Sequence, residues 1–278
     1  MLHEIHPRVF DNAWKPCLLA DGDRVLCYGK GGILLTADTT LPQAGMLGGA
    51  AALWRQEDPT YLFSIDDERF FLIEPREAPP TMGHQPLAEA RQKLPQDQAF
   101  AATTGEQLHR WYSNNRICGR CGGPTRRSEV ERALCCDCGN VIYPKISPAI
   151  IVAVSDGRRL LMTRNVRSAY KRYGLVAGFV EIGESFEQAV VREVQEEVGL
   201  RVKNVRYYKS QPWGVSDSEM IGFFADLDGD DTITVQESEL SEAVWFTREE
   251  IPTPVSTHSI AQELIEAVRG RLGERAST

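Results

Sequence analysis

The sequence predicts an α+β protein: a mixed β-sheet with helices packed on it, preceded by a cysteine ribbon and a small, mostly-β N-terminal domain. Three observations support this fold class. Short apolar runs bounded by turn residues fill the first quarter of the chain. Two Cys-x2-Cys pairs follow near the middle. Strand and helix patterns then alternate to the end. We expect an N-terminal domain and linker over residues 1–95, a helix and ribbon over 96–145, and a C-terminal domain over 146–278.

Length and composition restrict the class of protein. With 278 residues, 42% of them hydrophobic, the chain can build more than one core. A formal net charge of −8 argues against a protein that mainly wraps nucleic acid. No apolar run reaches the roughly 18 residues of a membrane span, and the N-terminus lacks the regions of a signal peptide. We therefore expect a soluble, cytoplasmic protein.

The N-terminal domain is expected to contain two hairpins. Residues 16–20 and 24–28 flank the turn signal 21–23, and residues 61–65 and 70–73 flank 66–69. Five prolines between 75 and 95 predict a linker. A short helix is expected over 100–115, and its apolar side is Leu108, Trp111 and Tyr112.

Two cysteine pairs predict a metal site. Cys118 and Cys121 form one Cys-x2-Cys knuckle, Cys135 and Cys138 form the other, and a glycine follows each. This spacing is typical of a tetrahedral structural zinc with four thiolates. A single pair would equally fit a redox motif, and the arginines of the ribbon leave nucleic-acid binding as a weaker alternative. Cys136 is left out, because its one-residue spacing to Cys138 is tighter than the usual knuckle.

The C-terminal half predicts a sheet with helices packed on it. A glycine-bearing loop with Gly178 and Gly183 leads into a helix, which Ser185 begins and Gly199 ends. The expected strands are residues 149–154, 160–162, 175–177, 205–208, 220–227 and 243–246, and a closing amphipathic helix covers 259–269. The buried stripe of the first helix is expected to be Phe186, Ala189, Val190, Val194 and Val198.

Three carboxylates border that apolar stripe. At about 100° per residue, Glu193 and Glu197 lie on one side of the helix, and Glu196 flanks them. Like charges this close repel one another, and a hard divalent cation with oxygen ligands removes the repulsion. The alternative is a solvated acidic face, which is common on glutamate-rich helices.

Gly178 to Leu200 resembles a known family motif. It fits the Nudix box, G-x5-E-x7-R-E-U-x-E-E-x-G-U with U aliphatic, at every fixed position. The resemblance implies an α/β/α sandwich that hydrolyses nucleoside diphosphates linked to another group, using Mg²⁺ or Mn²⁺. It does not name the substrate.

The residues around the box resemble one branch of that family. A four-cysteine ribbon, Tyr143-Pro144, Ser147-Pro148 and Ser210-Gln211-Pro212-Trp213 together are similar to the NADH pyrophosphatase family. Those enzymes cut NAD(H) into AMP and nicotinamide mononucleotide, and bacterial members also remove NAD caps from RNA. The family's central Pro-Phe-Pro is Gly214-Val215-Ser216 here. This departure concerns substrate preference more than hydrolysis.

The resemblance implies roles for individual residues. Two or three Mg²⁺ or Mn²⁺ ions would be held by Glu193, Glu197, Glu239 and the carbonyl of Ala177, with Glu196 as a further contact. Glu197 or a neighbour would be the general base, while Arg192 would hold the glutamates and Glu184 would fix the loop. In a homodimer, adenine would stack on Phe179 and be closed by Tyr143 of the second subunit. The other contacts would come from Gln211, Pro212, Trp213, Gly214, Val215, Ser216, Asp217, Ser218 and the backbone at Ala261.

Alternatives stay open at this point. Phe179 and Trp213 also fit core aromatic residues, and Tyr143 fits a residue that packs beside the ribbon. A Nudix hydrolase of ADP-ribose or a diadenosine polyphosphate would carry the same box, as would a module that senses a nucleotide without cutting it. The intact glutamates argue against the sensing module. The choice among NADH, NAD⁺ and NAD-capped RNA, and between Mg²⁺ and Mn²⁺, is open, as is the role of the N-terminal domain.

Overall fold

The computed structural model describes residues 1–48, 59–74, 78–166, 172–253 and 259–273. Within it the chain forms two compact units. Unit 1 comprises Met1, Ile146–Trp213 and Ser218–Thr278, and unit 2 comprises Leu2–Lys145 with Gly214–Asp217. In the described ranges, none of the helices is long and apolar enough to span a membrane.

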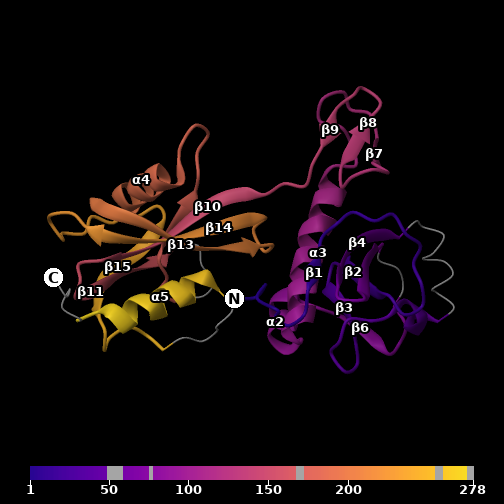
Figure 1. Cartoon of the computed structure of the whole chain (residues 1–278), viewed down its shortest axis with the longest axis horizontal. Coiled ribbons are helices and arrows are strands. Elements are labelled where there is room, and N and C mark those ends of the chain that lie inside the picture. Colours follow the sequence, from indigo (N-terminus) through magenta and orange to yellow (C-terminus); the bar gives the residue numbers. More distant parts are fainter. Residues whose placement is uncertain (49–58, 75–77, 167–171, 254–258, 274–278) are drawn as a thin grey trace. The chain divides into compact units, whose positions relative to one another are not determined.

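Unit 1 is built on a six-stranded mixed sheet (Figure 1). Its order is β13-β14-β10-β11-β15, and β12 pairs with β10 beside this path. β10 and β14 are parallel, whereas the other pairs are antiparallel, as the predicted mixed sheet requires. The strands are β10 (Ser147–Ser155), β11 (Arg159–Asn165), β12 (Val176–Phe179), β13 (Val202–Trp213), β14 (Ser218–Leu227) and β15 (Leu240–Thr247).

Helices α4 (Phe186–Val198) and α5 (Ile260–Arg271) cover opposite faces of this sheet. Successive side chains of a strand point to opposite faces, so β10 serves both cores. Ile150 packs in the cluster of α4, and Ile151 packs in the cluster of α5. Unit 1 is therefore the predicted α/β/α sandwich.

The ends of α4 follow the sequence signals. The Ser185 side chain accepts a bond from the Gln188 amide while the Gln188 side chain accepts from the Ser185 amide, which completes a capping box. Gly199 ends the helix with a left-handed φ of 70°. The predicted stripe is buried from Ala189 onward, but the prediction for Phe186 is wrong, because this side chain is exposed. Side chains tilt toward a helix's N-terminus, so a residue in the first turn points past the end of its helix.

Unit 2 contains a second six-stranded sheet, in the order β1-β4-β5-β2-β3-β6. The hairpin of β4 and β5 is confirmed. The hairpin over 16–28 is wrong: residues 16–20 form no strand, and β2 pairs with β3 and β5. The Ala20 amide donates to the Asp23 carboxylate at 2.7 Å, which makes this stretch a turn. The strands are β1 (Phe10–Asp11), β2 (Arg24–Gly29), β3 (Gly32–Thr36), β4 (Thr60–Ile65), β5 (Glu68–Ile73) and β6 (Met82–Gln85), and the 3₁₀-helix η1 covers Ala44–Leu47.

Residues 75–95, which were predicted to be a linker, form regular secondary structure over most of their described part. They contain β6 and helix α2 (Leu87–Lys93), while residues 75–77 lie outside the described ranges. Pro86 and Pro95 occupy the N-cap positions of α2 and α3. Proline is tolerated where a helix begins, because the first turn has no use for its missing N–H. These two prolines therefore mark helix starts, which composition alone does not distinguish from a linker.

Helix α3 (Gln96–Asn114) is confirmed and begins four residues earlier than predicted. Its Leu108 and Trp111 are buried in one core that also includes Leu26 of the sheet and Leu134 of the ribbon. The ribbon consists of β7 (Thr125–Arg127), β8 (Leu134–Cys136) and β9 (Val141–Ile142). Sheet, helix and ribbon of unit 2 thus share a single hydrophobic core.

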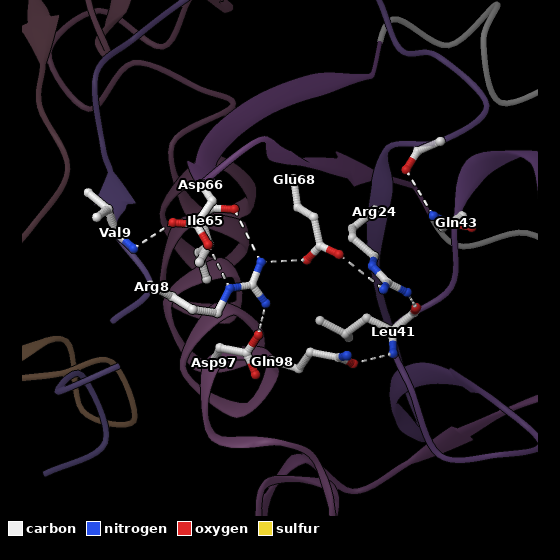
Figure 2. A network of polar contacts seen from close by, with 11 residues as sticks. Arg8, Val9, Arg24, Leu41, Gln43, Ile65, Asp66, Glu68, Asp97 and Gln98 are labelled. Atoms are coloured by element: carbon white, nitrogen blue, oxygen red, sulfur yellow. Dashed lines mark hydrogen bonds and ion pairs between the residues drawn. The ribbon is translucent and has the colours of Figure 1, made fainter. Parts of the chain in front are cut away.

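An arginine network fastens the N-terminal segment inside unit 2 (Figure 2). Arg8 donates to Asp66, Glu68 and Asp97, and Glu68 also accepts from Arg24. The bond to Asp66 is the main cause that raises the pKa of Arg8, so the guanidinium stays charged. Charge-assisted bonds of this kind are about twice as strong as neutral ones. The network joins the β4–β5 turn to the first turn of α3.

Candidate active site

The loop before α4 passes against a glutamate. A Cβ placed on Gly178 would lie 2.1 Å from the carboxylate of Glu193. That distance is far shorter than any real contact, so only glycine fits beside this carboxylate. Gly183, in the same loop, has a φ of +88°, which favours glycine for a different reason. Geometry thus explains both glycines of the loop before α4.

Replacing Gly178 with alanine should displace the Glu193 carboxylate. We expect hydrolytic activity to fall by about 10²-fold, because a shift of about 1 Å in a positioned group has effects of this size. Turnover would be measured beside Gly174→Ala, since a Cβ on Gly174 meets nothing within 4 Å. Equal activity of the two variants would contradict a role for this close approach.

Two carboxylates are buried at the site. Glu193 is 8% exposed and Glu197 is 5% exposed, whereas Glu196 lies at the surface. Burial, with the nearby charges of Glu193 and Glu239, raises the pKa of Glu197 to about 8. Burial also raises the pKa of Glu193. In the part of the chain that the structure describes, no cationic side chain pairs with Glu197. This arrangement fits a divalent cation, which would supply the missing positive charge.

Arg192 organises the surrounding carboxylates. Its Nε and Nη2 donate to the two oxygens of Glu184, both at 2.8 Å, and its Nη1 donates to Glu193 at 2.8 Å and to Glu196 at 3.0 Å. A further bond reaches the Phe179 carbonyl at 3.0 Å. Glu184 also accepts from the Glu181 amide, and Arg192 lowers its pKa. Arg192 therefore holds the glutamates, and Glu184 fixes the loop, as the sequence predicts.

A loop brings Glu239 to the same place. The Gln236 amide donates to the Glu197 carbonyl at 2.9 Å, and the Glu239 amide donates back to Gln236 at 3.0 Å. The Glu239 carbonyl accepts from Val166 at 2.8 Å. The charge of Glu239 contributes to the raised pKa of both Glu193 and Glu197. Glu239 thus lies near the carboxylates of α4, although it follows them by some forty residues in the chain.

The raised pKa of Glu197 predicts a pH-dependent stability of the metal-free protein. A carboxyl group whose folded pKa exceeds its ordinary value favours folding while protonated, and this contribution is lost as pH rises from the ordinary value toward about 8. We expect Tm in a chelator to fall between about pH 4.5 and 8. Glu197→Gln should have a shallower dependence, because its amide does not titrate. The same pH dependence in both proteins would contradict this origin.

Four thiols gather in the ribbon of unit 2. The ligand atoms of Cys118, Cys121, Cys136 and Cys138 all lie within 4.8 Å of one another. Among the described residues, this is the only group of three or more such ligand atoms within that distance, so the glutamates are spaced more widely. The amides of Arg120 and Cys121 lower the pKa of Cys118 to about 6, which favours the metal-binding thiolate.

The structure places Cys136 in this cluster, and not the predicted ligand Cys135. Both residues lie in β8, where neighbouring side chains point to opposite faces. The Cys136 sulfur lies 3.4 Å from that of Cys121. A tight turn returns Cys138 to the cluster, because the Gly139 amide donates to the Cys136 carbonyl at 2.9 Å and Gly139 has a φ of 82°. The glycine after Cys138 was the available sequence signal for this turn.

Comparison with known proteins identifies the family. A family model described as NUDIX domain matches residues 145–268. A protein of Haemophilus influenzae (strain PittGG) named NAD-capped RNA hydrolase NudC is 42% identical over 179 residues, which cover 63% of this chain and 67% of the relative. One of the same name from Actinobacillus succinogenes is 43% identical over 184 residues, or 63% and 69% of the two chains. The chain belongs to the Nudix family, as a relative of the NudC hydrolases.

Solved Nudix proteins are also similar to the chain. A Nudix hydrolase from Nitrosomonas europaea matches 49% of this chain and 80% of its own, at 24% identity and a TM-score of 0.44. The Nudix domain of Shewanella oneidensis NrtR, solved in complex with ADP-ribose, matches 46% and 88% at 18% identity and a TM-score of 0.36.

The substrate-binding residues implied by the resemblance differ in their exposure and in their hydrogen-bond partners. Phe179 is exposed within the box, and Tyr143 is exposed in unit 2, where its hydroxyl donates to Glu131 at 3.1 Å. Ala261 lies in the first turn of α5. Gln211 is fully buried, and its Oε1 accepts from the Ile260 amide at 2.7 Å. Its side chain therefore anchors the start of α5, and substrate contact by this residue stays a prediction.

The remaining implied contacts belong to the end of β13, the turn that follows it and the start of β14. Pro212 and Val215 are exposed, Trp213 is half-buried, and Ser218 is buried. Asp217 adopts a left-handed φ of 55°. Substrate contact by this segment stays a prediction.

Proposed function

We propose that this Nudix protein hydrolyses the diphosphate of NADH or NAD⁺ to AMP and nicotinamide mononucleotide, and that it removes NAD caps from RNA. The buried carboxylates of Glu193, which Arg192 holds, and of Glu197 support the hydrolytic chemistry. The names of relatives that are 42–43% identical support the substrate. A module that senses a nucleotide without cutting it would have no use for two buried carboxylates at this position.

Two or three Mg²⁺ or Mn²⁺ ions would be held by Glu193, Glu197, Glu239 and the Ala177 carbonyl, with Glu196 at the surface. Oxygen-only ligands suit these hard cations. When bound, the ions would neutralise the diphosphate and lower the pKa of an attacking water. A carboxylate oxygen of Glu197 would accept the proton of that water. Arg192 would keep Glu193 and Glu196 oriented through the bonds described above.

A single Zn²⁺ would bind the four thiols of the ribbon. Four thiolates complete a tetrahedral shell, so this zinc would have no open position and its role would be structural. It would join the strands of the ribbon, one of which contributes Leu134 to the core of unit 2. Removing the zinc should therefore lower stability before it alters chemistry.

Substrate would be recognised by stacking of the adenine on Phe179. This ring is exposed within the box, and Arg192 donates to the backbone carbonyl of the same residue. In a cytoplasmic homodimer, Tyr143 of the second subunit would close the other side of the adenine. Pro212, Trp213, Gly214, Val215, Ser216, Asp217, Ser218 and the Ala261 backbone would contact the remainder of the dinucleotide.

Product analysis tests this function. Incubation with NADH and Mn²⁺ should give AMP and reduced nicotinamide mononucleotide on chromatography, and a chelator should stop the reaction. NAD-capped RNA should give RNA with a 5′-monophosphate. Rapid cleavage of ADP-ribose or diadenosine polyphosphates without AMP from NADH would overturn the proposed substrate. A panel of these substrates, ranked by kcat/KM, tests the alternative. The departure from the family motif at Gly214-Val215-Ser216 is the observation that favours another substrate.

A further inference from the structure

Unit 2 contains a cavity that the proposed hydrolysis does not use. Its volume is about 850 Å³, and all of its lining residues belong to unit 2. Cavities that bind small molecules usually measure roughly 300–1,000 Å³. The wall is formed by the stretch before β2, by β4 and β5, by the end of α3 and by the ribbon strands β7 and β8. Three separate parts of one folded unit therefore meet at this cavity.

Aromatic side chains form part of the wall. Trp14, Tyr61 and Tyr112 all line the cavity. Tyr61 is held edge-on against Phe71, with ring centroids 5.6 Å apart. Burial raises the pKa of Tyr112 to about 12, so its hydroxyl stays neutral at physiological pH. Flat, uncharged surfaces of this kind stack with nucleobases, independently of the base.

Two guanidinium groups are fixed in or beside the same wall. Arg127 lines the cavity, is partly buried and donates to the Thr60 hydroxyl. Arg132 is near Tyr61 and Tyr112, and it donates to the side-chain oxygen of Asn12 and to the Leu62 carbonyl. Burial lowers the pKa of both arginines.

Two more arginines stand at the rim. Arg116 pairs with Glu74 at 2.7 Å, and Arg126 pairs with Asp137 at 3.2 Å. Both pairs are well exposed, and exposed ion pairs contribute little stability. Either arginine can therefore exchange its carboxylate for a phosphate at small cost. The charged residues that line the cavity are Arg116, Arg126, Arg127, Glu74 and Glu129.

We propose that this cavity binds a nucleotide. Its phosphate would be held by Arg127 with Arg116 or Arg126 from the rim, and its base would lie flat against Trp14 or Tyr112. Planar guanidinium groups match phosphate oxygens, and the aromatic wall suits the base. The nucleotide would be either a free mononucleotide or one unit of an RNA chain, since both present the same two groups. The site is additional to the Nudix box, with which it shares no residue.

Binding to the full-length protein in a chelator tests the proposal without turnover, so its outcome is independent of the proposed hydrolysis. The probes are AMP and a short, uncapped single-stranded RNA. Hydrogen exchange locates binding, because AMP is also a product of the proposed reaction and can occupy the box. Protection is expected in Thr60–Leu62 and Thr125–Ser128. Trp14→Leu and Arg127→Gln should each lower the binding affinity at least about tenfold, because the loss of a charge-assisted bond or of a stacked base has about this effect.

The matched control is Arg120→Gln, which removes the same charge from an exposed ribbon arginine outside the cavity lining. It should bind as the wild type does, and thermal melts would verify that all variants are folded. Protection by AMP identifies a free nucleotide as the ligand, whereas protection by RNA alone identifies a chain. The absence of protection by both probes at millimolar concentration overturns the proposal. An equal loss in Arg120→Gln does so too.

Discussion

Glu197→Gln is expected to lower kcat for NADH hydrolysis by at least about 10²-fold, whether Glu197 is the general base or a metal ligand. The side chain keeps its size, so packing is preserved, but the amide neither accepts a proton as readily nor carries the charge that a divalent cation requires. The variant also lacks the buried carboxylate of Glu197, which has no cationic partner among the described residues. Stability without metal should therefore stay equal or rise at neutral pH, although activity is lost.

This opposite effect on activity and stability separates a functional carboxylate from a structural one. Steady-state turnover with Mn²⁺ and thermal melts in a chelator would be measured for each variant. The matched control is Glu187→Gln, an exposed glutamate of the same helix. It should retain activity close to that of the wild type. If Glu197→Gln kept activity within about tenfold of the wild type, neither role would apply to Glu197.

The elements of the active site were predictable because their signals are local. The sequence of helix α4 has an N-cap, a C-terminal glycine and a stripe of apolar residues within one short stretch. The structure has both helix ends where these signals predict them, and the stripe is buried from Ala189 onward. The role of Arg192 was expected only once the box had been matched to its family. Glu239 was found only through the family resemblance, because loop contacts such as that of Gln236 with Glu197 leave no periodic signal in sequence.

Two differences between the sequence signals and the structure have another cause, because they depend on a tertiary partner. Gln211 resembles a ligand residue in its motif, but its partner is the backbone of Ile260, far along the chain. Residues 16–20 have strand composition, but the Asp23 carboxylate takes the Ala20 amide that a strand would use. Pro86 begins a helix where composition predicted a linker. Local propensity is overridden wherever a distant group satisfies the backbone.

Cys136→Ser is expected to lose the metal of the ribbon, whereas Cys135→Ser is expected to keep it. The Cys136 sulfur belongs to the four-thiol cluster, and a hydroxyl is a poor replacement for a thiolate. Because structural zinc contributes folding energy directly, Cys136→Ser should lower Tm markedly and reduce zinc content well below one ion per chain. The two variants differ by one position in the same strand, so each controls for the other.

A reversed result would have a specific structural meaning. Side chains alternate along a strand, so a slip of one residue exchanges its two faces. In the structure Cys135 pairs with Arg126 of β7, and Cys136 pairs with Thr125. Loss of zinc in Cys135→Ser alone would require β8 to slip by one residue against β7. The side chain of Leu134 would then turn away from the core of unit 2, where it is now 4% exposed. Strand β8 contributes Leu134 to the core and Cys136 to the thiol cluster. A slip of this strand should therefore change zinc content and Tm together.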